Sequence, residues 1–294
     1  MRVVEVSQQS AVVRIKDGCL SISVDGSLLG SVPVAEVGCV LLSSPHATCS
    51  VAALAALSAY GTPVIVCDEA MRPAGMMLPF RGQHEVATRM AAQATASLPL
   101  RRRLWKSIVK AKIAGQAAIL AEATGSDHHL SLMMKRVRAG DPENVEGRAA
   151  RRYWSRLFGG SFRRRRGEGI VNKMLDYGYA ILRAAVARAL SVAGLHPGLG
   201  IHHHHRSNAF ALADDLIEPF RPALDRVVVA CRSLHETHKD LSPPLKRRLA
   251  TCLNEAIPMV GEQRTVQDAV ARSASSLAGV FLGEREELSL PWIG

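Results

Sequence analysis

Aromatic side chains, closely spaced cysteines and long apolar runs are all scarce in this chain of 294 residues. Only 4% of its residues are aromatic, which argues against a surface that stacks the bases of single-stranded nucleic acid. The six cysteines lie far apart among mostly apolar neighbours and form no C-x-x-C pair. Buried free thiols are therefore expected, and a thiolate zinc site is not.

The sequence also lacks the patterns of membrane and export segments. No apolar stretch approaches the ~20 residues that a transmembrane helix needs. The N-terminal residues MRVVEVSQQS do not follow the charged-then-apolar order of a signal peptide. Because 48% of the residues are hydrophobic, the chain can bury a core without disulfides. We expect a cytoplasmic protein that does not bind membranes.

Positive charge is concentrated in one quarter of the chain. Residues 101–170 hold 17 Lys and Arg against 6 Asp and Glu, a net charge of +11 that equals that of the whole chain. Such a confined excess is typical of a surface that neutralises the phosphates of a polyanion. A basic face that only keeps the protein soluble is the alternative. With so few aromatics, contact with the backbone of double-stranded DNA is the better interpretation.

The N-terminal quarter alternates apolar and polar residues as β-strands do. Asp17-Gly18 predicts a hairpin turn, and residues 47–60 have the apolar spacing of a helix that ends at Gly61. A helix packed against a small sheet is the economical arrangement. The strands are expected at residues 2–7, 11–24, 31–44 and 63–68.

The rest of the chain is dominated by helical periodicity. We therefore predict an α+β fold, with a small β-rich domain at residues 1–75 (a β-sandwich or sheet with a packed helix) and a larger all-α catalytic domain at residues 85–294. Residues 76–84 are predicted to be a linker or flap, because their surroundings are rich in Pro and Gly. The tail at residues 288–294 is expected to be partly ordered at best. Helices are expected at residues 84–98, 100–125, 128–140, 144–159, 171–194, 224–236, 245–257 and 266–283.

One stretch, residues 199–222, has the composition of a metal site. It places four consecutive histidines, His202 to His205, about a dozen residues before Asp214, Asp215 and Glu218. Imidazole with carboxylates is a ligand set that Mn²⁺ accepts and Mg²⁺ tolerates. A polar surface loop that leads into an ordinary helix stays open as the alternative.

Helical geometry does not separate the two aspartates. Asp215 and Glu218 are three residues apart, Asp214 and Glu218 are four apart, and both pairs would share a face. Pro219 is unfavourable inside a regular helix, so the helix either kinks there or ends near Glu218. Arg221 could pair with a carboxylate of the site or reach a phosphate.

A second candidate segment is NVEGRAARRYWSRLFG, residues 144–159. Glu146 stands in the first turn of the helix predicted here. A glutamate in that position more often complements the helix dipole than binds a metal. The arginines of the segment form one or more basic faces along the helix.

Four segments of the chain, taken in order, resemble the CRISPR-associated adaptation integrases, the Cas-one family, and most closely its type II members. The segments are GTPVIVCDEAMRPAGMMLPFRGQH (61–84), NVEGRAARRYWSRLFG (144–159), LDYGYAILRAAVARAL (175–190) and GIHHHHRSNAFALADDLIEPFRP (200–222). The resemblance implies a Mg²⁺ or Mn²⁺ site made by Glu146, His203 and Glu218.

The choice of histidine rests on the same resemblance. In type II members the ligand lies five residues before the Asn of the N-x-F segment, which is Asn208 here, and this implies His203. His204 is the alternative, because other branches of the family have a slightly shorter loop. Asp215 matches the family's D-x-x-E aspartate and is expected to bind the metal or to hold a ligand in place.

The resemblance also implies an activity and partners. Members insert short double-stranded DNA fragments (spacers) into a prokaryotic CRISPR repeat array, by attack of a 3′-hydroxyl on a phosphodiester. They act as homodimers, which the N-terminal domain would form, bridged by the small Cas-two family protein. We expect residues 101–112 and 148–166 to contact the DNA backbone. The DNA-binding candidates are Lys106, Lys110, Arg148, Arg151, Arg152, Arg163, Arg164, Arg165 and Arg166.

Three other functions remain open from the sequence. A structure-specific nuclease would use the same site to cut without joining. A sequence-specific regulator would explain the positive charge but would not need Glu146 and Glu218, and no helix-turn-helix pattern stands out. An assembly protein with a degenerate site would be expected to have lost an acidic ligand, and none is lost here.

Overall fold

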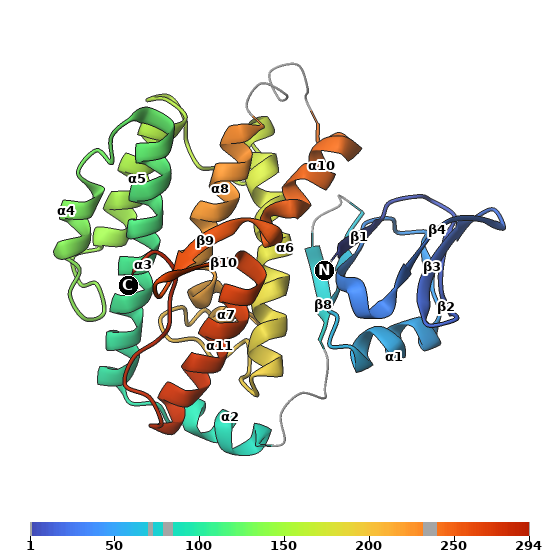
Figure 1. Ribbon diagram of the computed structural model, residues 1–294, viewed down its shortest axis with the longest axis horizontal. Helices are drawn as coiled ribbons and strands as arrows, with labels where there is room; N and C mark the ends of the chain where they lie inside the picture. The colour runs from blue at the N-terminus through green and yellow to red at the C-terminus, as the bar shows by residue number, and fades with distance from the viewer. Residues whose placement is uncertain (1, 70–72, 79–84, 232–239, 294) are drawn as a thin grey trace.

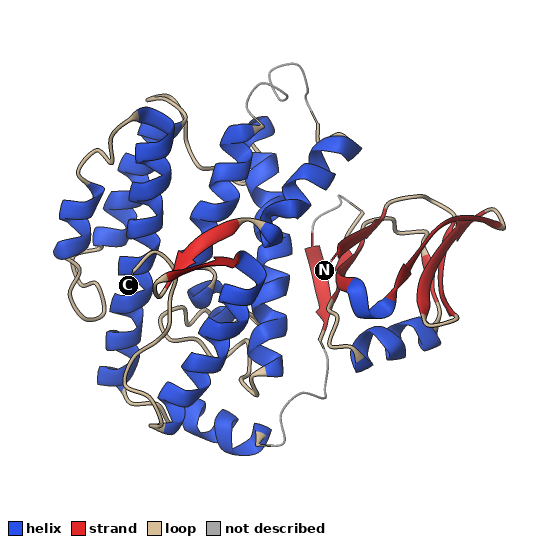
Figure 2. Cartoon of the chain, in the orientation of Figure 1, coloured by secondary structure: helices blue, strands red, loops and turns tan. Residues whose placement is uncertain are grey.

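The computed structural model describes residues 2–69, 73–78, 85–231 and 240–293 of the chain. Figure 1 shows a β-rich N-terminal domain beside a larger, mostly helical C-terminal domain. Figure 2 shows that the strands gather in the N-terminal domain, apart from one short hairpin among the helices. The α+β fold predicted from the sequence is confirmed.

The first sheet of the N-terminal domain has the strand order β1-β5-β7-β8. Its members are β1 (Arg2–Val6), β5 (Val37–Leu42), β7 (Val64–Cys67) and β8 (Pro73–Met77). The first three run parallel and β8 runs antiparallel to β7.

Strand β8 corrects the predicted linker. Met76 and Met77 pair with Ile65 and Val64, so they belong to the N-terminal sheet. The prolines and glycines of this segment suggested a loop, but a proline is compatible with the first position of an edge strand, where its missing N–H is tolerated. The rest of the predicted flap, residues 79–84, lies outside the described residues.

The second sheet has the order β4-β3-β2-β6. Asp17 and Gly18 connect β2 to β3 with φ angles of +48° and +72°, as the predicted turn requires. The strand expected at residues 31–44 is interrupted by a 3₁₀ turn, Val34–Glu36. The members are β4 (Ser27–Pro33), β3 (Cys19–Val24), β2 (Ala11–Lys16) and β6 (Thr48–Cys49).

Helix α1 (Val51–Ala59) packs against this domain, starting later than predicted because residues 48–49 pair with β2. Ser50 caps it, since its side chain accepts a hydrogen bond from the backbone N–H of Ala53 at 3.2 Å. The core of the domain contains Val4, Val6, Ala11, Val13, Leu20, Val34, Val37, Val40, Ala53, Leu57 and Val64.

The C-terminal domain is built around two long helices, α3 and α6, whose buried residues belong to one large core. In the described ranges, no helix is long and apolar enough to cross a membrane. The helices are α2 (Val86–Ala94), α3 (Leu98–Thr124), α4 (Leu130–Lys135), α5 (Val145–Leu157), α6 (Gly169–Val192), α7 (Ala211–Leu216), α8 (Arg221–Ala230), α10 (Pro243–Ala250) and α11 (Val266–Leu282), with 3₁₀ turns at Glu218–Phe220 and Thr251–Asn254.

A hairpin of β9 (Ala256–Met259) and β10 (Glu262–Thr265) interrupts the helices, so this domain is mostly helical but not all-α as predicted. The helix expected at residues 245–257 ends at Ala250 and passes through a 3₁₀ turn into β9. Residues 256–259 alternate between exposed and buried, which is the period of a strand and not of a helix.

The C-terminal tail is packed against the body of the domain, so the expectation of partial order was wrong. Leu288 and Leu290 are buried. The hydroxyl of Ser273 in α11 donates to the carbonyl of Ser289 at 2.6 Å, and the hydroxyl of Ser276 accepts from the Ser289 N–H at 3.0 Å. The six cysteines are free as predicted; three are buried and three are partly exposed.

The two domains meet along α6. Ala184 packs against Cys39, Leu41 and Ile65 of the first sheet. Polar contacts reinforce this contact, because Glu5 accepts hydrogen bonds from the Tyr177 hydroxyl at 3.1 Å and from the Lys246 ammonium at 2.8 Å.

A buried carboxylate joins three helices of the larger domain. Asp225 of α8 accepts hydrogen bonds from the hydroxyls of Tyr153 in α5, at 3.0 Å, and of Tyr179 in α6, at 2.5 Å. Burial raises the pKa of Asp225 to about 7, although the two tyrosine hydrogen bonds act to lower it. Folding therefore favours the protonated form of the Asp225 side chain.

This preference predicts a pH-dependent stability. Since the pKa of Asp225 is higher in the folded than in the unfolded state, its contribution is lost as pH rises from about 4 to about 7 and stays constant above that. Asp225→Asn mimics the protonated acid, so it should match the wild type in stability near pH 4 and exceed it at pH 8 by up to about 4 kcal/mol. Urea unfolding of both proteins across this pH range measures the difference; a difference independent of pH would contradict the assignment.

Candidate active site

Glu146 is fixed at the N-terminus of α5 by two capping side chains. The carboxylate of Asp141 accepts hydrogen bonds from the backbone N–H groups of Val145 and Glu146, both at 2.9 Å. The side-chain oxygen of Asn144 accepts from the N–H of Gly147 at 3.1 Å. These bonds satisfy N–H groups that a helix start leaves unpaired, and they hold the backbone of Glu146 rigidly.

The residue after Glu146 is Gly147, and its lack of a side chain lets Asn144 cap the helix closely. A Cβ atom at this position would lie 2.6 Å from the capping oxygen of Asn144, so any other residue would force the Asn144 side chain to shift and would disturb the cap. The sequence N-x-E-G is therefore the signature of a tight helix cap that presents the glutamate. Asp141 was missed in the sequence, although its position three residues before Asn144 in a D-P-E-N turn is typical of a capping residue.

Asp215 holds the backbone of the histidine loop by hydrogen bonds. Its carboxylate is fully buried and accepts backbone hydrogen bonds from Ile201 at 2.6 Å, His202 at 2.9 Å and His203 at 3.1 Å. The same carboxylate lies 2.6 Å from Nδ1 of His203. Asp215 thus holds a ligand candidate in place, which is one of the two roles predicted for it.

Asp214 has a different partner, which resolves the ambiguity left by helical geometry. It pairs with Arg183 at 2.9 Å and accepts from the side-chain amide of Asn208 at 2.8 Å.

The close approach of loop and helix depends on Gly200. A Cβ atom there would lie 2.3 Å from the carbonyl oxygen of His203 and 3.1 Å from a carboxylate oxygen of Asp215. Any side chain would push the loop away from the buried carboxylate, so the glycine before the histidines is required by packing.

The four histidines have separate environments. The imidazole of His202 stacks on Trp105 of α3 with ring centroids 4.1 Å apart and planes within 1°, and burial lowers its pKa. His203 is held by Asp215, His205 lies 2.8 Å from the hydroxyl of Ser207, and His204 is exposed. His203 is therefore the histidine that the structure orients. With Nδ1 engaged by a carboxylate, Nε2 is the nitrogen left for a metal, a common arrangement for metal-binding histidines.

Glu218 sits where one helix ends and the next begins. Helix α7 stops at Leu216, a 3₁₀ turn spans Glu218–Phe220, and α8 starts at Arg221. This break at Pro219 confirms the interruption predicted from the proline. The carbonyl of Pro219 accepts a 2.8 Å hydrogen bond from the indole N–H of Trp292, so the C-terminal tail supports the turn that carries Glu218.

The carboxylates of Glu146 and Glu218 converge on Lys112. The lysine lies in the middle of α3, where it is buried, and its ammonium pairs with an oxygen of Glu146 and lies 2.5 Å from Oε2 of Glu218. Arg221 lies 3.1 Å from the other oxygen of Glu218. Ion pairs thus bring Lys112, Glu146 and Glu218 together, although they lie far apart in the sequence.

Electrostatics agree with this arrangement. Burial alone would raise the pKa of Glu218, but Arg221, Lys112 and His203 hold it below its ordinary value. Burial alone would lower the pKa of Lys112, but Glu218 and Glu146 raise it above its ordinary value. The hydrogen bond to Asp215 raises the pKa of His203, and Glu218 also contributes, so the imidazole lies within electrostatic reach of Glu218.

Lys112 was expected in the DNA-contacting segment 101–112, and the structure corrects this. It lies seven residues after Trp105 and four after Ile108, and therefore on the buried face of α3, whereas Lys110 two residues earlier is partly exposed. That position was the available signal for a buried, paired lysine.

The structure does not form a ready-made metal cluster. In the part of the chain that it describes, no three His, Cys, Asp or Glu side chains are arranged to hold a metal ion. Two of the predicted ligands, Glu146 and Glu218, meet at the Lys112 ammonium, and His203 is oriented nearby by Asp215. The three-ligand metal site stays a prediction.

The predicted DNA contacts fall into two groups. Arg148, Arg151 and Arg152 are exposed and share one face of α5 at i, i+3 and i+4 spacing. Arg164 instead pairs with Asp176 at 2.5 Å, and its guanidinium lies over the ring of Tyr179, which makes it structural. The other candidates are the exposed Arg163, Arg165 and Arg166, and the partly exposed Lys106 and Lys110.

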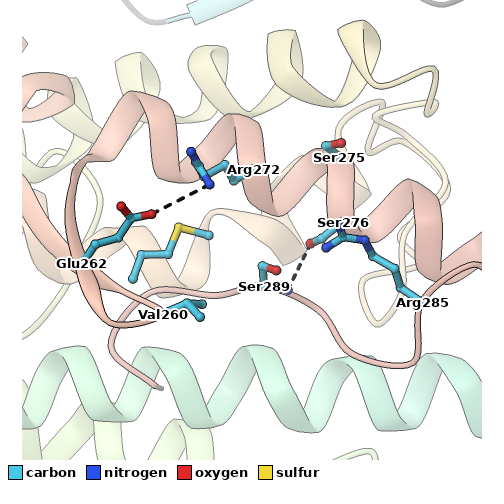
Figure 3. Close-up of a pocket in the computed structure, with 8 residues that line it drawn as sticks. Val260, Glu262, Arg272, Ser275, Ser276, Arg285 and Ser289 are labelled. Atoms are coloured by element: carbon cyan, nitrogen blue, oxygen red, sulfur yellow. Dashed lines mark hydrogen bonds and ion pairs between the residues drawn. The ribbon is translucent and has the colours of Figure 1, made fainter.

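A separate cleft of about 270 Å³ lies between the β9–β10 hairpin and α11 (Figure 3). It is lined by serines and by the ion pair of Glu262 with Arg272. None of the predicted site residues lines it, and the side chains drawn in Figure 3 include no histidine or cysteine. The cleft is not the candidate active site.

Comparison with known proteins gives consistent matches. A family model described as "CRISPR associated protein Cas1" matches residues 4–254. The CRISPR-associated endonuclease Cas1 of Neisseria meningitidis serogroup C (strain 8013) is 35% identical over 267 residues, which cover 90% of this chain and 87% of that protein.

Solved structures share the fold. A casposase bound to integration product superposes with a TM-score of 0.80 at 21% identity, covering 98% of this chain and 92% of that one. A chain of a Cas6-RT-Cas1–Cas2 complex superposes with a TM-score of 0.74 at 18% identity, covering 96% of this chain and 35% of that one.

The two adjacent aspartates provide a test of the site's framework. Asp215→Asn should lower the free energy of unfolding by ~3 kcal/mol, because a buried acceptor of three backbone N–H groups and an imidazole is disrupted. Asp214→Asn is the matched control and should cost about 1 kcal/mol or less, because its pair with Arg183 is partly exposed. Chemical denaturation measures both; equal losses would contradict the organising role of Asp215.

Proposed function

Because the chain belongs to the Cas1 family of CRISPR-associated proteins, we propose that it joins short double-stranded DNA fragments into a CRISPR repeat array by metal-dependent phosphodiester transfer. The names of its relatives support a DNA endonuclease or integrase, since one is a CRISPR-associated endonuclease and another a casposase bound to integration product.

One observation carries the proposal. Glu146 and Glu218 come from different helices, and the fold brings both to the Lys112 ammonium. Packing two carboxylates together is unfavourable unless a cation compensates them, and such arrangements are frequent at functional sites. A purely structural DNA-binding protein or regulator would not need this arrangement.

The residues fit a hard divalent ion. Glu146 and Glu218 supply carboxylate oxygens and His203 supplies Nε2, a donor set suited to Mn²⁺ and acceptable to Mg²⁺. Oε2 of Glu218 is buried and lies 2.5 Å from the Lys112 ammonium. A buried carboxylate oxygen that already faces a cation is consistent with a position that a metal would use. When bound, the ion would polarise the scissile phosphate and help to align the attacking oxygen.

The protein's own side chains position the reacting groups. The 3′-oxygen of the incoming fragment forms a bond to a phosphorus of the repeat strand, and the bond from that phosphorus to the repeat's own 3′-oxygen breaks. The proton lost by the attacking hydroxyl is balanced by one gained at the departing 3′-oxygen. Arg221 keeps Glu218 ionised and in place, and Asp215 fixes His203. No covalent enzyme intermediate is required.

The basic face of α5 and the loop after it would hold the DNA. Arg148 lies two residues after Glu146 on α5, about 200° around the helix, so this basic face points away from the Glu146 side chain and bound DNA would reach the carboxylates only around the N-terminus of the helix. Phosphate contacts of this type position a duplex without reading its sequence.

Insertion into both strands requires two sites, so we also propose a homodimer and a Cas2 partner. Leu28 and Leu29 are 66% and 60% exposed on β4, the terminal strand of the second sheet, which offers an apolar edge for dimerisation. A relative of the same fold is part of a complex with Cas2.

A nuclease that cuts branched DNA without joining is the second candidate. The curated relatives carry the name endonuclease, and the same carboxylates and histidine would serve water as the nucleophile. An assay that follows joined product separately from cut product distinguishes the two.

The carboxylates give the main prediction. Glu146→Gln and Glu218→Gln should each reduce strand joining by at least about 100-fold while changing duplex affinity, measured without divalent ions, by less than about threefold, because they remove a metal ligand and no phosphate contact. Glu143→Gln is the control, since Glu143 lies just before α5 and pairs only with Arg138 among the described residues. Joining of labelled fragments with Mg²⁺ or Mn²⁺ measures the rates. Full joining by either active-site variant would contradict the assignment of that glutamate as a metal ligand.

The histidine loop gives a second prediction. His203→Ala should reduce joining by at least about 100-fold, whereas His204→Ala and His205→Ala should stay within about threefold of the wild type, because only His203 is oriented by Asp215. The same joining assay applies. A larger loss in the His204 variant than in the His203 variant would transfer the ligand role to His204.

A further inference from the structure

We propose that Lys112 is a movable counter-charge that makes metal binding at this site depend on DNA. The inference rests on the proposed function, since it takes Glu146, Glu218 and His203 as the metal-binding residues. It concerns what the lysine does when a metal and a DNA phosphate enter.

The charges around the two carboxylates leave the site close to neutral. Glu146 and Glu218 are the two anions, and Lys112 and Arg221 are the two cations in contact with them. Asp214 pairs with Arg183, and Asp215 contacts His203, whose imidazole is neutral when its Nε2 is free to bind a metal. With Asp215 counted, the site carries one net negative charge before a metal binds.

A divalent ion alone would leave this site with one excess positive charge. Charge repulsion is strong where side chains are shielded from water, so binding of the ion by itself is opposed by Lys112. DNA phosphates bring negative charge to the same place and remove the excess. Metal and DNA should therefore strengthen each other's binding, and thermodynamic linkage requires the effect to be equal in both directions.

The exposure of the side chains gives the direction of entry. The side chains of Lys112 and Glu218 are each 9% exposed, whereas those of Glu146 and His203 are 25% and 44% exposed. Metal and phosphate would enter from the side of Glu146 and His203. The ammonium lies at the inner end of the site and must withdraw from Glu146 when the metal takes its place.

Gln116 offers the position to which the ammonium withdraws. It lies one helical turn after Lys112 on α3, it is 2% exposed, and its side-chain oxygen has no hydrogen-bond partner among the residues that the structure describes. An unpaired buried oxygen is costly, and residues four apart on a helix are neighbours on one face. The flexible four-carbon stem of Lys112 allows its ammonium to turn toward this oxygen while its charge stays inside the protein.

Titration of the protein with Mn²⁺, followed by the electron paramagnetic resonance signal of the free ion, tests the proposal. Each protein is titrated with and without a duplex whose 3′ ends are dideoxy-terminated, so that no joining occurs, and duplex alone supplies the baseline. For the wild type, DNA should tighten Mn²⁺ binding at least about tenfold. A change below about twofold would overturn the proposal, whatever the variants do.

Two variants should act in opposite directions. Lys112→Met should bind Mn²⁺ without DNA at least about tenfold more tightly than the wild type and respond to DNA by less than about threefold, because the opposing charge is gone. Gln116→Leu should bind Mn²⁺ about tenfold more weakly in the presence of DNA, because the ammonium has lost its second position. Lys135→Met removes an exposed lysine of α4 and should behave as the wild type.

The outcomes separate this inference from the proposed function. If Lys112→Met binds Mn²⁺ without DNA no more tightly than the wild type, Lys112 is only a structural partner of the carboxylates and the inference is overturned. Lys112→Gln gives the same comparison if the methionine variant does not fold. If Glu146→Gln binds Mn²⁺ as the wild type does, the metal lies elsewhere, and the proposed metal site fails together with the inference.

Discussion

The arrangement of the C-terminal domain depends on one electrostatic constraint: two carboxylates that are held close together and away from water must be compensated by positive charge. Lys112 supplies that charge from the centre of α3, and Arg221 adds a second contact to Glu218. The constraint ties α3, α5 and the turn between α7 and α8 to a single point. Packing of the long helices then serves to hold this point, and the candidate chemistry follows from it.

Each carboxylate is presented by a local break in regular structure. Glu146 lies at a helix start that Asp141 and Asn144 cap, and Glu218 lies in a 3₁₀ turn at Pro219. Such positions aim side chains away from the body of a helix while the backbone remains fixed. Trp292, near the end of the chain, also helps to fix Glu218, because its indole N–H donates a hydrogen bond to the carbonyl of Pro219 in the turn.

The sequence predicted those features whose causes are local. Alternation located most strands, the proline located the helix break, and the resemblance to a family identified Glu146, His203 and Glu218 as candidates. Features that depend on partners distant in sequence were not predictable in this way. The burial of Lys112 needs two carboxylates from other helices, and the structural role of Arg164 needs Asp176 and Tyr179.

The same limit explains the errors in secondary structure and order. Strand β8 exists because β7 offers an edge for it to pair with, and the tail is ordered because α11 provides hydrogen bonds for Ser289. Among four identical histidines, only the contact with a buried aspartate singles out one. Composition and spacing carry no information about such contacts. The caps and the proline break, in contrast, depend only on residues that are neighbours in the sequence.

The most direct test of the central claim is the position of the metal itself. Crystals of the protein with bound duplex and Mn²⁺, measured at a wavelength where manganese scatters anomalously, would locate the ion without reference to activity. The account predicts an anomalous peak within coordination distance of carboxylate oxygens of Glu146 and Glu218 and of Nε2 of His203. A peak at His204 or His205 instead, or no peak between the two glutamates, would contradict it.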